Sequence, residues 1–145
     1  MIEIRTEENG AVAHPNGPHH HEQTRAIAEA LSETARLLNY ATLPGNGGLR
    51  YPSDVYSVLG SLAGMTRILP QALEQVADWI AAEVSAGRAQ ENPHYGPYRG
   101  DAAAAATALR SVLAEAARTA NQLGGLLDEG QTAVRGLESA RQDDE

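Results

Sequence analysis

The densest group of metal-ligating side chains in the sequence comprises four histidines: His14, His19, His20 and His21. Imidazoles this close together in the chain could hold a transition metal. A structural zinc site needs four rigidly defined ligands, however, and the chain has no cysteine to contribute. The alternative is a solvated, flexible, His-rich segment. We expect this second interpretation to hold, with no bound metal and no other cofactor.

A second group of chemically capable side chains lies in the polar connection AQENPHYGPYRG, residues 89–100. Its candidate partner-binding residues are His94, Tyr95, Tyr98 and Arg99. Ordered function is often carried by loops, and Tyr and Arg are favoured in protein interfaces. In the alternative interpretation, the two tyrosines fold back over the ends of the neighbouring helices. The sequence leaves both interpretations open.

The remaining motifs do not predict catalysis. The glycine-rich PGNGG, residues 44–48, lacks the Lys and Ser/Thr of a phosphate-binding loop and the spacing of GxGxxG. It is typical of a flexible connection between helices. No Glu-x-x-His pair lies in a predicted helix, no Ser/His/Asp arrangement stands out, and Glu74 and Asp78 fit a solvated helix face. We therefore expect no enzymatic activity.

Helices must position these residues, because apolar side chains recur at intervals of three and four along residues 51–88. This stripe comprises Val55, Leu59, Leu62, Leu69, Leu73, Val76 and Ile80, and only Thr66 interrupts it. Ser53 is the expected N-cap and Gly87 the expected C-terminal glycine. Pro70 lies inside the stripe, so we expect one helix with a kink near it.

Two further stripes predict helices over residues 22–43 and 101–140. The first contains Ile27, Leu31, Thr34, Leu38 and Ala41. The second contains Leu109, Leu113, Ala116, Ala120, Leu123, Leu127, Val134 and Leu137, a spacing typical of coiled coils. Asp101 is the expected N-cap of the last helix. Gly124 and Gly125 predict a bend or a tight contact in its middle.

Together these patterns predict an all-α fold, an elongated three-helix bundle. A long antiparallel hairpin, with helices of roughly 50 and 60 Å, would be joined by a shorter N-terminal helix that covers about half of it. Residues 1–21 would form a flexible N-terminal tail and residues 141–145 an acidic one, leaving 22–140 as the bundle domain. The apolar stripe would stay exposed near Trp79 and Ile80 or near Val134 and Leu137, and such exposure is typical of an interface.

A patch of small residues, which includes Gly60 and Gly64, lies largely off the main stripe. Two glycines one turn apart are costly in a water-exposed helix, so another backbone should approach them closely. The N-terminal helix is one candidate for this approach. The other is a partner protein or a second copy, which makes Gly60 and Gly64 candidate partner-binding residues.

The composition also restricts the class of partner. All 11 basic residues are Arg, they are scattered along the chain, and the net charge is -8. Nucleic-acid binders concentrate positive charge on one face, so we expect no direct binding to nucleic acid. No run approaches about 18 apolar residues, and the first residues have no secretory core, so we expect a cytoplasmic protein without a membrane partner.

The segments YPSDVYSVLGSL (51–62) and LPQALEQVADWI (69–80) resemble a stretch of small uncharacterised helical proteins of actinomycetes, some of them near mobile elements. This resemblance implies no activity. The hairpin is also similar in outline to small helical secretion substrates that carry a Trp-x-Gly turn. That turn is missing here, because Trp79 is followed by Ile80 and Ala81 inside a predicted helix.

These observations predict a non-enzymatic interaction or structural protein. It would associate with itself or dock onto a partner protein through coiled-coil-like helix packing. Two alternatives remain: a bundle that binds a small ligand or metal, and a regulator that acts on nucleic acid only through a partner.

Overall fold

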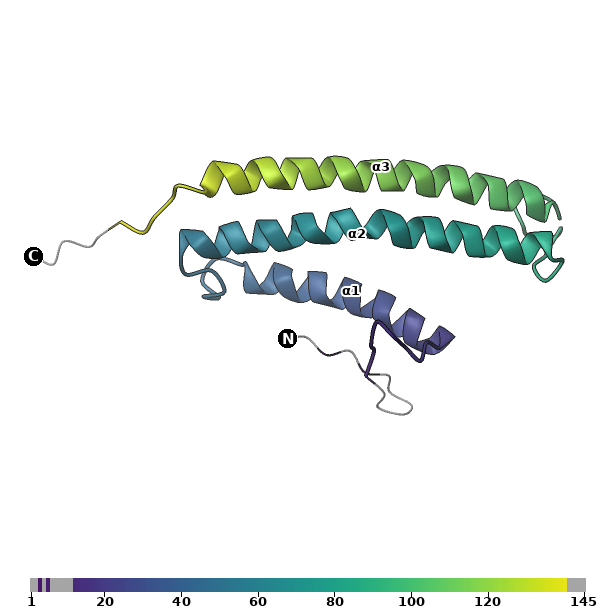
Figure 1. Ribbon diagram of the computed structural model, residues 1–145, viewed down its shortest axis with the longest axis horizontal. Coiled ribbons are helices and arrows are strands. Elements are labelled where there is room, and N and C mark those ends of the chain that lie inside the picture. The colour runs from purple at the N-terminus through teal and green to yellow at the C-terminus, as the bar shows by residue number, and fades with distance from the viewer. Residues whose placement is uncertain (1–2, 4, 6–11, 141–145) are drawn as a thin grey trace, which may run out of the picture. The chain divides into compact units, whose positions relative to one another are not determined.

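The computed structural model describes residues 3, 5 and 12–140, and this part of the chain is all-α, as predicted (Figure 1). Its helices are α1 (His21–Ala41), α2 (Pro52–Ser85) and α3 (Ala102–Val134). The chain divides into two compact units, Met1–Arg50 and Tyr51–Glu145, which we describe one at a time. The predicted acidic tail and most of residues 1–11 lie outside the described residues.

Helices α2 and α3 form the predicted long antiparallel hairpin and lie side by side (Figure 1). They have 34 and 33 residues, which corresponds to about 50 Å each. Near the start of α2, Nε2 of Gln131 donates a hydrogen bond to the carbonyl oxygen of Tyr56 at 3.1 Å. Towards the other end, Arg110 forms an ion pair with Asp78 at 2.8 Å. These contacts fix the antiparallel register.

The most buried residues of this hairpin are small. They are Ala63, Thr66 and Ala77 in α2 and Ala106, Ala120 and Gly124 in α3. Small side chains let the two backbones approach each other closely, as the alanine-rich composition suggests. The large apolar residues of the predicted stripe lie at the margins of this contact, half-buried or exposed.

Thr66, which we expected to interrupt the stripe, is only 1% exposed. Its hydroxyl donates a hydrogen bond to the carbonyl oxygen of Ala63 at 2.8 Å, which satisfies the polar group inside the hairpin. Across the contact, a Cβ on Gly124 would lie 2.7 Å from the Thr66 Oγ1. The predicted tight contact in α3 is therefore found at Gly124, and Thr66 belongs to the core.

The start of α2 differs from the prediction, and its end agrees. Tyr51, not Ser53, is the N-cap, and the Asp54 carboxylate accepts a hydrogen bond from the Tyr51 amide at 2.8 Å. At the other end, Gly87 has φ +71° and its amide donates to the carbonyl oxygen of Val84. The Arg88 amide donates to the carbonyl oxygen of Glu83, which completes a Schellman motif. The helix continues through Pro70, as expected.

Helix α3 begins as predicted but ends earlier. The Asp101 carboxylate accepts a hydrogen bond from the Ala104 amide at 2.9 Å, the expected N-cap. The helix ends at Val134 rather than near residue 140. Gly130 and Gln131 lie beside Leu59 and Gly60, in the third turn of α2, so only about the first turn of α2 lies opposite the chain beyond Val134. Gly136 also disfavours continuation.

The N-terminal unit contains α1, which starts and ends within two residues of the prediction. Arg36 donates two hydrogen bonds to the Glu33 carboxylate, one turn earlier, at 2.9 and 2.6 Å. A Cβ on Gly48 would lie 2.0 Å from the Ala41 carbonyl oxygen, so the connection after α1 needs a glycine at this point. The extent to which α1 covers the hairpin stays a prediction.

Candidate functional site

The hairpin carries a set of large apolar side chains that are exposed between 42% (Met65) and 70% (Ile68). We call this set the apolar face, and it comprises Met65, Ile68, Val76 and Trp79 of α2 with Val112, Leu123 and Leu126 of α3. Within each helix, successive members of this set are separated by three residues or by a combination of three- and four-residue steps. They therefore lie along one side of the helix, next to its buried side. The prediction of an exposed Trp79 is confirmed, but the stripe extends well beyond it.

A shallow groove of about 520 Å³ runs along this face between α2 and α3. Its floor contains small side chains, among them Thr66, Ala116 and Ala120, and its rims carry Met65 and Leu123. Among the residues that line it, Glu115 carries the only charge, and Arg118 of the same helix pairs with it. The groove can therefore accept apolar side chains without stranding a buried charge.

Ion pairs between α2 and α3 lie on other sides of these helices. Arg67 donates to both oxygens of Asp128, at 2.6 and 2.5 Å, and Arg110 pairs with Asp78. Arg67 and Asp78 are each two residues beyond Met65 and Val76, a spacing that turns a side chain away from the first one's face. The hairpin thus separates its apolar side chains from its interhelical charges.

The loop between α2 and α3 is held by the carboxylate of Glu91. Its two oxygens accept hydrogen bonds from the amides of Tyr98 and Gly100, both at 2.7 Å. A Cβ on Gly96 would lie 2.5 Å from the Glu91 side chain, so the carboxylate fits only because residue 96 is a glycine. Asn92 Oδ1 also accepts a hydrogen bond from the His94 amide at 2.9 Å. The loop is consequently ordered by its own hydrogen bonds.

This arrangement brings the predicted loop residues onto one short, exposed segment. His94 and Arg99 are exposed, and Tyr98 is 39% exposed. Tyr95 is 84% exposed, so the interpretation in which it folds back over the helix ends is wrong. Glu91 was missed at the sequence level because its function depends on the fold of the loop. The partner-binding role of these residues stays a prediction.

An ion pair fixes the exit from α2 into this loop. Arg88 donates two hydrogen bonds to the Glu83 carboxylate, at 2.9 and 2.7 Å, and the Glu83 side chain is only 18% exposed. The Arg88 hydrogen bonds hold the pKa of the Glu83 carboxyl below its ordinary value. The same interaction raises the pKa of Arg88.

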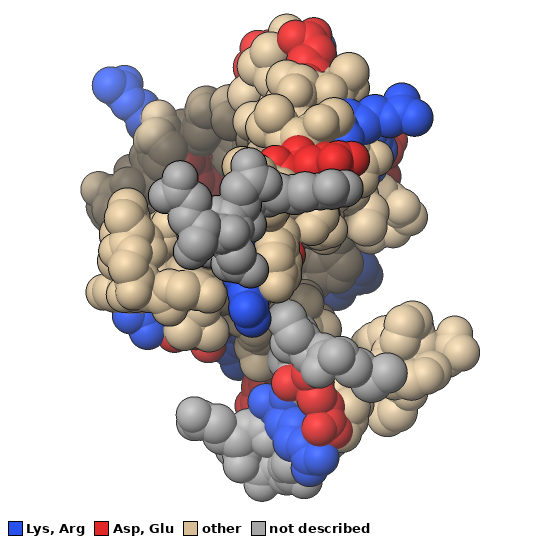
Figure 2. Space-filling model, turned by 90° about the vertical axis from the view of Figure 1, so that its left-hand side faces the viewer, with Lys and Arg blue, Asp and Glu red and all other residues tan. Residues whose placement is uncertain are grey.

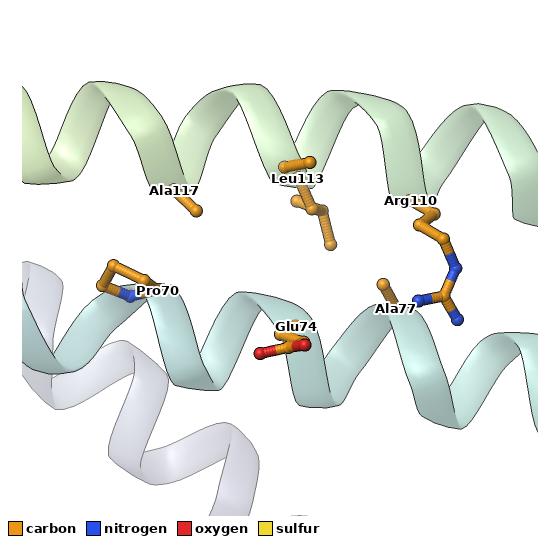
Figure 3. A pocket seen from close by; sticks show the side chains of 7 residues that line it. Pro70, Glu74, Ala77, Arg110, Leu113 and Ala117 are labelled. Carbon is orange, nitrogen blue, oxygen red and sulfur yellow. The ribbon is translucent and has the colours of Figure 1, made fainter.

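A smaller pocket of about 270 Å³ lies between α2 and α3 beside Pro70 (Figure 3). Arg110 reaches from α3 towards α2 there, and Glu74 and Leu113 also line the pocket. The volume falls below the range of about 300–1,000 Å³ typical of ligand sites. Arg110 is, in addition, already paired with Asp78.

The two predicted glycines lie in different surroundings. A Cβ on Gly60 would lie 2.4 Å from Nε2 of Gln131, so the group close to this position is a side chain of α3 and not the backbone that we predicted. A Cβ on Gly64 would meet no atom within 4 Å in the part of the chain that the structure describes. Of the pair, only Gly64 leaves its surface open to a partner.

The four N-terminal histidines do not form a metal site in the structure. In the described residues, no group of three or more His, Cys, Asp or Glu side chains could hold a metal ion. His14 instead accepts a hydrogen bond from the Asn16 amide through Nδ1, and His21 lies 3.7 Å from Glu22.

Two global properties bear on the class of partner. On the face drawn in Figure 2, the Arg side chains of the described residues are scattered among acidic and uncharged ones, with no continuous basic area. None of the helices in the described residues has the length and apolar character to cross a membrane.

No protein-family model, curated protein or solved structure matches the chain.

Proposed function

We propose that the chain is a non-enzymatic protein-interaction module that binds another protein chain through the apolar face of its hairpin. The observation that supports this most is the exposure of seven large apolar side chains on the hairpin, three of which (Met65, Val112 and Leu123) line the groove. Exposed apolar patches of this size in a folded protein are typical of interaction sites. Trp and Met, both present on this face, are also enriched in interfaces.

Three properties favour protein over small ligand or nucleic acid. The groove is open and long, which suits a helix laid along it better than an enclosed small molecule. The Pro70 pocket is small and its Arg110 is engaged. The net charge of -8 and the scattered arginines oppose direct contact with a phosphate backbone.

The proposal can be tested by placing a photo-crosslinking amino acid at Leu123, on the apolar face, in cells that naturally express the chain. The matched control carries the same amino acid at Asn121, an exposed residue two positions before Leu123, a spacing that turns it away from the face. We expect a discrete protein adduct at position 123 and none at position 121. Absence of any adduct at 123, or equal adducts at both positions, would contradict the proposal.

A further inference from the structure

We infer that the occupant of the apolar face is a second copy of this chain, packed face to face around a two-fold axis. This inference rests on the proposed function and specifies its partner. The outcome would be a layer of four helices in which two hairpins cover each other's grooves.

The exposed area fits a dimer. With ordinary side-chain sizes, the exposed parts of the seven residues amount to roughly 800 Å², about what each partner contributes to a standard interface. Smaller contacts are usually too weak for specific association. A second copy brings an identical area, so both surfaces would be covered in a single step.

The charge distribution also fits. Two chains that each carry a net charge of -8 would repel each other if their acidic residues met. The groove contains a single charged residue, Glu115, and it is paired with Arg118. The interhelical ion pairs Arg67–Asp128 and Arg110–Asp78 lie outside the groove lining. Each copy brings one Glu115 to the contact, and its own Arg118 offsets that charge, so two apolar faces can meet without an unpaired negative charge from the groove lining.

The shape of the apolar face is complementary to the same face of a second copy. Small floor residues such as Ala116 and Ala120 alternate with larger rim residues such as Met65 and Leu123. Rim side chains of one copy can enter the groove of the other, which is the ridges-into-grooves arrangement of packed helices. Because the same patch serves both copies, the contact is isologous and closes at two chains.

If the two-fold axis of the dimer passes through the centre of the apolar face, one residue should lie next to its own counterpart. Thr119 lies midway between Val112 and Leu126 in α3 and lines the groove. In an isologous contact, a residue near the centre lies close to its own counterpart. Thr119 of one copy should therefore lie near Thr119 of the other.

The test combines solution mass with four substitutions that each add one negative charge. The two on the face are Val112→Glu and Leu123→Glu. The controls, Ser111→Glu and Asn121→Glu, change exposed residues that are turned away from the face. Light scattering from micromolar to near-millimolar concentration should show the unsubstituted chain passing from one to two copies. We expect the face variants to raise the dimer dissociation constant at least about thirtyfold and the controls to leave it nearly unchanged.

Circular dichroism should show unchanged helicity in all four variants, because positions 112 and 123 are exposed in the hairpin. A second experiment, cysteine cross-linking, does not depend on adding a charge. The chain has no cysteine, so Thr119→Cys supplies a single thiol, and a short bis-maleimide should link it to a second copy. Asn121→Cys, at an exposed position turned away from the face, is the control, and it should link much more slowly.

A monomer at every concentration, equal dimerisation of face and control variants, or equal linking of the two cysteines would overturn the inference. The failure of the proposed function is distinguishable. If the chain stays monomeric but a different protein is photo-crosslinked at position 123, the interaction module stands and the second copy is wrong. If neither a dimer nor an adduct forms, both proposals fail.

Discussion

Gly124 and Gly125 are neighbours in α3, yet their surroundings differ. A Cβ at Gly124 would lie 2.7 Å from the buried Thr66 hydroxyl, whereas a Cβ at Gly125 would meet no described atom within 4 Å. Gly125→Ala should stabilise the chain by about 0.5–1 kcal/mol through helix propensity. Gly124→Ala should instead destabilise it by about 1–2 kcal/mol, because overpacking outweighs the same gain. Urea unfolding followed by circular dichroism measures both free energies.

A double substitution can test whether the Thr66 hydroxyl causes the predicted destabilisation by Gly124→Ala. Thr66→Ala removes the hydroxyl that the new methyl group would meet, so the penalty of Gly124→Ala should shrink in the Thr66→Ala background. Such coupling is expected only between residues in contact. Equal effects of Gly124→Ala in both backgrounds would contradict the close contact.

Glu91 determines the shape of the loop that presents Tyr95. Its carboxylate accepts hydrogen bonds from two backbone amides, and charged acceptors form the stronger class of hydrogen bond. Glu91→Ala should lower the free energy of unfolding by about 1 kcal/mol and expose the amides of Tyr98 and Gly100. Hydrogen exchange at these two amides should accelerate, while α2 and α3 keep their protection. Gln90→Ala is an adjacent exposed control, and unchanged exchange in Glu91→Ala would contradict the structural role.

At the scale of an element, the end of α2 predicts a pH dependence. The pKa of Glu83 is lower in the folded chain than its ordinary value of 4.5 because Arg88 hydrogen-bonds to the charged form. The carboxylate therefore stabilises the fold above about pH 4.5, and this contribution disappears as the pH falls through the lowered pKa. Glu83→Gln should melt at a lower temperature than the unsubstituted chain at pH 7, and the difference should narrow towards pH 3.

Thermal unfolding by circular dichroism across this pH range tests the prediction. Glu74→Gln removes a negative charge from the same helix and serves as the control. If the two variants change the melting temperature equally at every pH, the Arg88 contact has no special effect.

The sequence determines where helices form more clearly than what each side of a helix contacts. Apolar residues at intervals of three and four positions predicted all three helices and the hairpin. The same pattern led us to misassign Thr66. A threonine interrupts an apolar pattern, but in the fold it fits against a facing glycine 58 positions later in the chain. The end of α3 was also missed, since the stripe continues to Leu137 although only about one turn of α2 remains opposite it and Gly136 disfavours the helix.

The candidate site was predicted in part for the same reason. The loop residues stand out by type, so their position on an exposed segment was predictable, but the Glu91 hydrogen bonds arise only in the folded loop. The sequence predicted exposure on the apolar face only at Trp79. Val76 and Leu123 belong to the predicted stripes, yet about half of each side chain is exposed. The other four members of the face lie beside these stripes, and which side of a helix stays exposed is known only once its partner helix is placed.

For the whole molecule, net charge and apolar surface have opposite effects on association. Each chain carries a net charge of -8, which opposes the approach of a second copy at long range. The apolar face favours the approach at contact, and its strength depends little on ionic strength. Salt therefore separates the two contributions, because it screens the repulsion between the chains and leaves the apolar contact largely unchanged.

Raising the ionic strength from about 0.01 M to about 1 M shortens the Debye length from about 30 Å to about 3 Å. We expect the dimer to become tighter over this range, because the repulsion between acidic chains is screened while the apolar contact persists. Sedimentation equilibrium at several salt concentrations measures the dissociation constant. An assembly held by ion pairs would weaken instead, as would binding to a nucleic acid. A dimer that dissociates as salt rises would therefore show that charged residues, and not the apolar face, hold the two chains together.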